Sequence, residues 1–477
     1  MHATPSWLLS VPLALVATGC ASDRMIEARA AYSRGDYVLA QQLTTELVDD
    51  GGSDKHLYQL EKGVTDLAVG DIDDAIQTWE AATYKLDELD GGSWAGDTAA
   101  WLSDDNALDY DGAAYERVMV RVAKLIAESV APNREMGDDI IAFGNQIIDE
   151  HERIYAKLTE ERDDLGGNSV ASPEAQFQFV GFGSYLVGTV LEQDPTAVDE
   201  ARLQYQTAAR VATDRAFVEQ GLQRIESGRF TEHQGDGVLH VFGMVGRGPY
   251  KVESSITAAQ SALNLASVIY AIIEDTPAAI GVTPVPIDVL QYHPDNPDAL
   301  AVELNGQAVG STAIVSDIER IAQLEYDATI DYRVARALIR RTLKQAATQA
   351  AATAVQASSD NGWAALLTII FGAIWTGVEQ ADLRCWSLLP ATCQAFRAEL
   401  EPGEYDVVLR ASVRGVPTGT PQTIRVRIRP GRNTYVVAMA PTQFGGPAPL
   451  SRDAIEVAPL PADPFDPDYE PNVEPTQ

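Results

Sequence analysis

The chain has 477 residues, and its 69 acidic residues outnumber its 35 basic ones, which gives a formal charge of −34 and a pI of about 4.4. This charge argues against nucleic-acid binding, because phosphate contacts depend on Lys and Arg. It also argues against electrostatic docking onto anionic lipid headgroups. The length is sufficient for two or three domains.

The first twenty residues have the pattern of a bacterial lipoprotein signal peptide. Leu8 to Ala17 is an apolar run that is too short to span a bilayer but suits a signal-peptide core. It leads into Ala17-Thr18-Gly19-Cys20, a lipobox in which small residues admit the peptidase and the thiol of Cys20 accepts the lipid. Ala17 stands where Leu is common, and His2 stands where Lys or Arg is expected. The alternative is a plain cleaved signal, or a different translation start.

The lipid on Cys20 would hold the mature chain at a membrane, because each buried methylene contributes about 0.8 kcal/mol. The residue directly after Cys20 is Ala21, not an acidic residue. In bacteria that sort lipoproteins by this position, that favours the outer over the inner membrane. We therefore expect a lipid-anchored protein of the cell envelope that faces the periplasm.

Two segments near the N-terminus share one helical-hairpin pattern. Each has a helical stretch, a Gly-Asp pair at Gly35 or Gly70, a bulky apolar residue, and an alanine at Ala40 or Ala75. Glycine permits the tight turn between two helices, and the small alanine lets the helices approach closely. The pattern predicts tetratricopeptide-like repeats; two unrelated hairpins are the alternative.

Helical periodicity continues to residue 232. The apolar spacing predicts helices over residues 115–130, 138–160 and 174–192. Residues 199–225 are again repeat-like, because they contain Ala201, Tyr205, Ala208 and Ala209. We therefore expect a helical region over residues 21–232. The acidic, glycine-rich stretch 91–112 inside it is expected to be a solvated loop.

At Asp236 the pattern changes to that of a mixed α/β region, residues 236–395. Residues 237–243 alternate and predict a strand, and residues 282–292 predict an edge strand because prolines interrupt them. Asn305-Gly306 lies between two apolar runs, which is a strong hairpin signal.

A long helix, or two, is predicted over residues 316–357. It carries a basic cluster that we expect to pair with the chain's own carboxylates rather than to form a partner site: Arg336, Arg340, Arg341 and Lys344. Residues 363–378 are almost entirely apolar but short for a membrane span. A buried core helix is expected there, and contact with the bilayer or with a partner is the alternative.

Cys385 and Cys393 are the two cysteines that remain if Cys20 is acylated. The periplasm permits disulfides, and a bridge closing this short loop would contribute about 2–3 kcal/mol. We expect the bridge, with two buried thiols as the alternative. No Cys/His spacing typical of a metal site occurs, and no cofactor is expected.

The C-terminal residues predict a small β-module over residues 396–446. Its strands are expected over residues 400–410, 423–429 and 433–439, in a sandwich or open sheet. From residue 447 to residue 477, repeated proline with Asp and Glu predicts a disordered acidic tail.

Five short motifs in chain order carry a resemblance to a known family: the lipobox and residues 110–118, 246–253, 379–390 and 400–405. With these motifs the chain resembles the uncharacterised bacterial lipoprotein family with N-terminal tetratricopeptide-like repeats. The resemblance implies a role in envelope assembly by association and carries no assigned activity. The chain departs from the family at the Cys385/Cys393 pair, the enlarged acidic loop and the acidic tail.

Together these observations predict an α+β fold: N-terminal tetratricopeptide-like helical repeats, then a mixed α/β region with a C-terminal strand-rich module. The expected function is a protein-binding scaffold for other envelope proteins, and a self-associating, homo-oligomeric structural component is the alternative. No acid/base carboxylate pair, Ser-His-Asp order or Cys-His order is recognisable, so we do not expect an enzyme. A cell-wall hydrolase is the least favoured alternative. His240, on an apolar strand, is expected to be a core residue.

Overall fold

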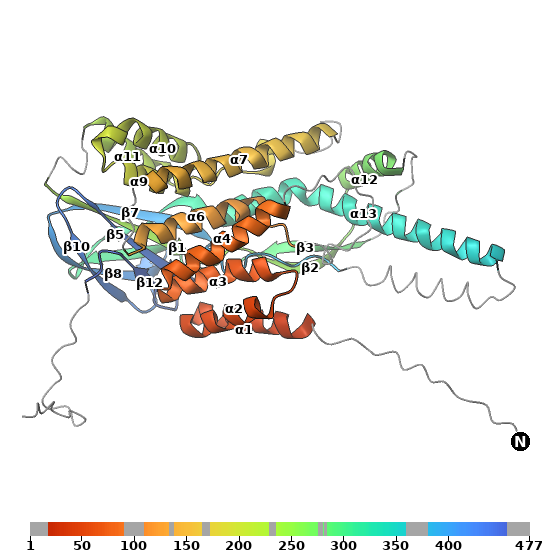
Figure 1. The fold of residues 1–477 in the computed structure, drawn as a ribbon, viewed down its shortest axis with the longest axis horizontal. Coiled ribbons are helices and arrows are strands. Elements are labelled where there is room, and N and C mark those ends of the chain that lie inside the picture. The colour runs from red at the N-terminus through yellow and green to blue at the C-terminus, as the bar shows by residue number, and fades with distance from the viewer. Residues whose placement is uncertain are drawn as a thin grey trace, which may run out of the picture.

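The computed structural model describes residues 18–89, 109–132, 138–164, 172–228, 235–274, 280, 284–358 and 380–455. In these residues the first half of the chain is helical and strands gather in the second half, which confirms the α+β class (Figure 1). Several predictions lie outside the described residues: the signal peptide up to residue 17, most of the acidic loop, the apolar run 363–378, and the tail from residue 456.

Four helices joined by short turns open the described chain: α1 (Thr18–Arg34), α2 (Tyr37–Asp50), α3 (Lys55–Val69) and α4 (Ile72–Leu89). Gly35 and Gly70 make the α1–α2 and α3–α4 turns with φ of +81° and +92°, a region that favours glycine. Ala40 and Ala75 are fully buried where each second helix packs. The two hairpins therefore have the local geometry that their sequence pattern predicts.

The remaining helices of the first half are α6 (Ala114–Val130), α7 (Asp138–Asp164), α8 (Pro173–Gln176), α9 (Phe182–Leu191), α10 (Val198–Val211) and α11 (Arg215–Glu226), with a 3-10 turn at Pro195–Ala197. The single helix predicted over residues 174–192 is wrong, because the chain is extended between α8 and α9. There the backbone N–H of Val180 donates to Nε2 of His151 on α7 (3.0 Å). Tertiary contacts thus replace the helical hydrogen bonds.

The stretch 199–225, which the sequence marks as repeat-like, forms two helices, α10 and α11. The carboxylate of Asp214 accepts from the N–H of Phe217 and begins α11. The N–H groups of Thr213 and Asp214 donate to carbonyls of Val315 and Ile314. The break therefore lets the helical layer hydrogen-bond to a strand.

The first sheet has the strand order β12 (Ala448–Leu450), β11 (Asn433–Ala440), β1 (Gly237–Val245), β7 (Thr392–Leu400) and β6 (Ala313–Asp317). Its central strand β1 runs parallel to β11 and antiparallel to β7. The β-module predicted to begin at residue 396 does not begin there, because that boundary divides strand β7. The sequence pattern did not predict β7. The predicted start of the tail at residue 447 is also too early, because β12 pairs with β11.

The second sheet has the order β10 (Gln422–Ile428), β8 (Gly403–Val413), β4 (Ala299–Leu304) and β5 (Gln307–Ser311), and β9 (Val416–Pro417) pairs with β8. Asn305 and Gly306 join β4 to β5 with positive φ at both positions, so the predicted hairpin is confirmed. The predicted C-terminal module is divided between the two sheets, because β11 belongs to the first and β8 and β10 to the second.

The third sheet has two antiparallel strands, β2 (Tyr250–Ile256) and β3 (Val285–Gln291). This sheet packs with α12 (Gln260–Glu274) and the long α13 (Ile318–Ser358) around a smaller core. The strand predicted over residues 282–292 and the long helix are thus both present. In Figure 1, α13 runs away from the sheets.

Strand β1 lies between two apolar layers. Phe242 and Met244 face the core that the N-terminal helices share, whereas Leu239 and Val241 face the second sheet. Because side chains alternate along a strand, the first sheet is buried on both faces. The largest core reaches from Met25 on α1 to the C-terminal strands, so the predicted helical and strand-rich regions share one core.

Candidate functional site: a groove and a polar cavity around residues 380–389

The N-terminal helices hold a segment of the chain's own C-terminal half. The buried Glu61 on α3 accepts from the N–H of Ser387 (2.8 Å), from its hydroxyl (2.6 Å) and from the N–H of Leu388 (2.9 Å). Arg29 on α1 also donates to the Ser387 hydroxyl. Burial raises the pKa of Glu61, and the charge of Arg29 and these hydrogen bonds act against that rise. Ser387 and Leu388 are therefore bound through their backbone by a buried side chain of α3.

Glu116 on α6 binds the same segment from the other side. Its carboxylate accepts from the N–H of Ala113 (3.1 Å), which caps α6, and from the N–H of Trp386 (2.8 Å). The Trp386 ring is buried and lies 6.4 Å from the ring of Trp79 on α4. Two buried carboxylates, Glu61 on α3 and Glu116 on α6, thus fix three consecutive N–H groups.

Arg384 ties the start of this segment to the helices. Its guanidinium forms ion pairs with Asp54 (2.8 Å) and Asp382 (2.8 Å) and lies over the ring of Tyr110 (5.6 Å). Burial would raise the pKa of Asp382, but the hydrogen bonds and charge of Arg384 hold it below its usual value. The backbone from residue 382 to residue 388 is therefore fixed at several points.

An open groove remains beside the bound segment, with a volume of about 600 Å³. We call it the α1–α3 groove; α1, the end of α2, α3 and residues 380–385 line it. Its apolar walls include Met25, Leu57 and Tyr58 and two exposed side chains, Ile26 (61% exposed) and Leu383 (41%). Such a wall can accept an apolar partner surface.

A polar cavity lies on the opposite side of residues 380–384, between α13 and the β2–β3 pair. Its two lobes have volumes of about 230 and 170 Å³ and share Asp111, Lys251, Arg333 and Asp382. Burial would lower the pKa of Lys251, but Asp288 and other nearby acidic groups raise it, so its ammonium is charged. A partly buried carboxyl also lines one lobe: desolvation raises the pKa of Glu325 to about 7, although it accepts from the N–H groups of Ala114 and Tyr115.

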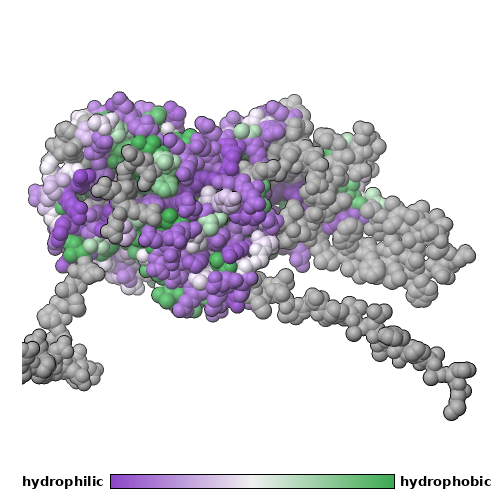
Figure 2. Space-filling view, viewed as in Figure 1, coloured by the Kyte–Doolittle hydropathy of each residue, from purple (hydrophilic) through white to green (hydrophobic). Residues whose placement is uncertain are grey.

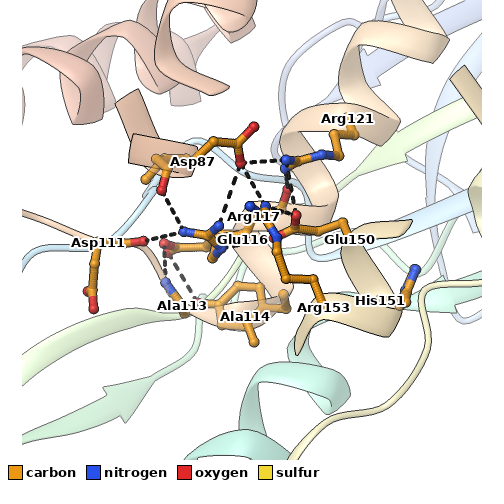
Figure 3. A network of polar contacts seen from close by, with 12 residues as sticks. Asp87, Asp111, Ala113, Ala114, Glu116, Arg117, Arg121, Glu150, His151 and Arg153 are labelled. Carbon is orange, nitrogen blue, oxygen red and sulfur yellow. Dashed lines mark hydrogen bonds and ion pairs between the residues drawn. The ribbon is translucent and has the colours of Figure 1, made fainter. Parts of the chain in front are cut away.

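A network of charged side chains positions one wall of this cavity. Arg117 on α6 donates to Glu150 of α7 (2.9 Å) and to the backbone carbonyl of Asp111 (3.4 Å) (Figure 3). Arg121 binds both Glu150 (3.0 Å) and Asp87 of α4 (2.6 Å). The network joins three helices and fixes the backbone of Asp111, so its role is structural.

A second buried cluster, around Glu192, is structural as well. Tyr205 (2.8 Å) and Asn433 (3.1 Å) donate to its carboxylate, and Arg224 forms an ion pair with it. Burial would raise the pKa of Glu192, but its contacts with His240, Arg224 and Tyr205 lower it to about 2. His240 is fully buried 3.6 Å from Glu192, and burial lowers its pKa, so it is a core residue as expected.

Cys385 and Cys393 are both buried, and their thiols are free, so the expected bridge is absent from the structure. Burial raises the pKa of Cys385 to about 11 and that of Cys393 to about 12. The alternative of two buried thiols describes the structure.

The other residues that the sequence singled out, Cys20 and the turn glycines, do not line the polar cavity. Cys20 is in the first turn of α1, and the Gly35 and Gly70 turns lie at the ends of helices. Sequence reasoning missed Glu61, Glu116, Lys251 and Arg333, because nothing near them in the chain marks their partners. The signal that could have found some of them was the set of motifs that carried the resemblance, since Glu116 lies in residues 110–118, Lys251 in residues 246–253 and Arg384 in residues 379–390.

Among the residues that the structure describes, no group of His, Cys, Asp and Glu side chains is arranged to hold a metal ion. No helix of that same part of the chain is both long and apolar enough to cross a membrane. No protein-family model matches the chain, and no curated protein and no solved structure shows significant similarity to it.

Proposed function

We propose that the protein is a lipid-anchored scaffold of the cell envelope, which is held to the outer membrane through Cys20 and binds another envelope protein in its α1–α3 groove. The observation that carries the proposal is this open, apolar groove, whose wall on α1 begins at Met25, five residues after Cys20. The protein acts by binding and not by catalysis.

The position of Cys20 supports an anchor close to the folded body. Met25, five residues later on the same helix, is already buried in the core, so about 7.5 Å of helix separates the two. A lipid on Cys20 would keep the groove within reach of the membrane surface. Figure 2 shows mostly hydrophilic side chains on the face that carries the N-terminal helices, which fits a surface that is otherwise solvated.

The segment of the chain already bound by the N-terminal helices supports binding of a partner segment through its backbone. Residues 386–388 lie there in a turn, with their N–H groups on Glu61 and Glu116. We interpret α1–α4 as two tetratricopeptide-like repeats, whose Gly35 and Gly70 turns and buried Ala40 and Ala75 match that interpretation. A partner segment would enter the open groove next to the bound one.

The anchor is tested by labelling growing cells with a palmitate analogue. The unaltered chain should carry the label and fractionate with outer membranes, whereas Cys20→Ser should lose the label and become soluble. Unchanged labelling of Cys20→Ser would refute the anchor.

The scaffold is tested with a photo-crosslinking amino acid placed at Ile26 or Leu383, in the groove. Tyr84 on α4 is the matched control, because it is 77% exposed and outside the groove. We expect one crosslinked envelope protein from both groove positions and none from Tyr84. A product of two copies of this chain would favour the self-associating alternative, and equal products from all three positions would refute a specific groove.

A further inference from the structure

Two neighbouring loops form a surface without charge in a strongly acidic chain. One loop, residues 415–421, leads from β8 to β10 and includes β9, and the other, residues 441–447, leads from β11 to β12. Neither loop contains an Asp, Glu, Lys or Arg, although these residues make up 22% of the chain. We call residues 415–421 and 441–447 the uncharged loop pair.

The two loops pack against each other through their backbones. A Cβ at Gly419 would lie 2.6 Å from the carbonyl oxygen of Gly445 and 2.9 Å from that of Gln443. The φ of Gly419 is +68°, which also favours glycine. Because the approach is this close, the two loops present one continuous surface.

This surface carries exposed apolar side chains. Phe444 is 71% exposed and Val416 is 62% exposed, and Val38, at 59%, lies beside them at the start of α2. The neighbour of Val38, Tyr37, donates from its hydroxyl to the carbonyl of Gly446 (3.1 Å). Single exposed apolar residues are ordinary on protein surfaces. Here, however, three of the five most exposed large apolar side chains of the described residues lie on segments that are in contact.

The uncharged loop pair lies at the far end of the helix that begins with Cys20. The hydroxyl of Thr442 donates to the carbonyl of Ser33 near the end of α1 (3.1 Å), and Ser33 is about 20 Å along the helix from Cys20. Glu27 and Arg34, which follow Cys20 at intervals of seven residues, are exposed, so α1 lies at the surface along this line. In Figure 1, α1 forms the lower edge of the molecule. A flat surface along α1 can therefore meet Cys20 and the loop pair together.

We propose that the uncharged loop pair contacts a bilayer of electrically neutral phospholipids and inserts Phe444 and Val416 between the headgroups. The inference rests on the proposed anchor, because the lipid on Cys20 would bring the loops to the bilayer. Two points of contact, one at each end of α1, would then fix which face of the protein is turned to the membrane. An apolar side chain that leaves water at the interface stabilises this orientation.

A second copy of the chain fits this surface less well than a bilayer does. A stable interface between proteins buries roughly 1,000 Å² or more, which three apolar side chains do not supply. Two copies, each with a charge of −34, would also repel each other. An anchored protein needs no such area, because its lipid supplies most of the membrane affinity. Since the loops lack Lys and Arg, they have no preference for anionic lipids.

The test places a photo-crosslinking amino acid at Phe444, Val416 or Leu203 in the full chain, bound to phosphatidylcholine vesicles. Leu203 is the control, because it is 50% exposed and lies on α10, at the opposite edge of the molecule in Figure 1. We expect mass spectrometry to find phospholipid adducts at Phe444 and Val416 and none at Leu203. No lipid adduct at the two loop positions, equal adducts at all three, or crosslinks between two copies would overturn the proposal.

The chain is attached to the vesicles in two ways, so that failure of the anchor is distinguished from failure of the contact. One sample keeps the lipid that cells add, and in the other the Cys20 thiol is coupled to a maleimide-bearing phospholipid. Coupling is selective because the thiols of Cys385 and Cys393 are buried. A chain that cells leave without lipid would refute the anchor only. A coupled chain without loop adducts would refute the contact only.

Hydrogen exchange with polar variants gives a second measurement on the coupled chain. On vesicles, amide exchange in residues 415–421 and 441–447 should slow several-fold relative to a Cys20→Ser chain in solution. A Phe444→Ser/Val416→Ser chain should lose this slowing, whereas Leu203→Ser should keep it. All three positions are exposed, so the fold should persist, which circular dichroism checks. Slowing that persists in the double variant would assign it to the anchor alone and overturn the proposal.

Discussion

Glu61 on α3 accepts hydrogen bonds from both the backbone N–H and the hydroxyl of Ser387, which lies 326 positions later in the chain. The contact joins the first helices of the molecule to the segment that leads into β7. Because Glu61 is buried, its loss would leave the N–H groups of Ser387 and Leu388 without a partner and away from water.

We expect Glu61→Ala to destabilise the fold by about 1–3 kcal/mol for each N–H group left unpaired. Glu61→Gln keeps one accepting oxygen and should cost less. Chemical denaturation measures both, with Glu88→Ala, at an exposed position on α4, as the control that should change stability by less than about 0.5 kcal/mol. Equal stability of the Glu61→Ala and control variants would contradict this account.

Gly63 on α3 leaves room for the ring of Trp79. A Cβ at this position would lie 2.3 Å from Nε1 of Trp79, whose N–H donates to the carbonyl of Leu60 (3.1 Å). Gly63→Ala should therefore destabilise by about 1–3 kcal/mol through overpacking, which outweighs the gain in helix propensity. Gly403→Ala, whose Cβ would have ordinary contacts, is the control. Thermal unfolding decides, and an unchanged or raised Tm for Gly63→Ala would show that the Trp79 ring can move.

Stability should fall as the pH rises towards neutral. Burial raises the pKa of Glu325 to about 7, above its value in the unfolded chain, so the folded state holds the extra proton. The contribution of Glu325 to the free energy of unfolding is therefore full below about pH 4.5 and is lost as the pH rises through about 7. The free energy of unfolding should fall by up to about 3 kcal/mol over this range. Glu325→Gln should flatten this slope in denaturation series from pH 5 to pH 8. A slope that is unchanged in the variant would assign it to other groups, such as Glu319, whose pKa burial also raises to about 7.

The thiols of Cys385 and Cys393 should resist alkylation in the folded protein. Both are buried, and burial raises the pKa of each, so little reactive thiolate forms near neutral pH. We expect a Cys20→Ser chain to take up no iodoacetamide when folded and two equivalents when unfolded without reductant, as mass spectrometry would show. Two equivalents appearing only after reduction would instead indicate the Cys385–Cys393 bridge.

Local patterns predicted local structure well. Asn305-Gly306 forms a hairpin because both residues tolerate positive φ, and the alternation after Asp236 gave strand β1. The helix predicted over residues 174–192 was wrong because the chain is extended between α8 and α9, where the N–H of Val180 donates to His151 instead of to a helical carbonyl. The prediction of a separate C-terminal module was wrong because β11 pairs with β1, which lies nearly 200 positions earlier in the chain. Strand partners depend on the whole arrangement, which alternation does not encode.

The sequence by itself determined the acidic character, the Gly35 and Gly70 turns, the hairpin and the α+β class, because these depend on composition and on neighbours within a few residues. Only the tertiary structure decided that the helices share a core with the first sheet and that Glu61 binds Ser387. It also decided that Lys251, Arg333 and Asp382 line one cavity. The physical reason is that packing, and not chain proximity, brings these groups together and removes them from water.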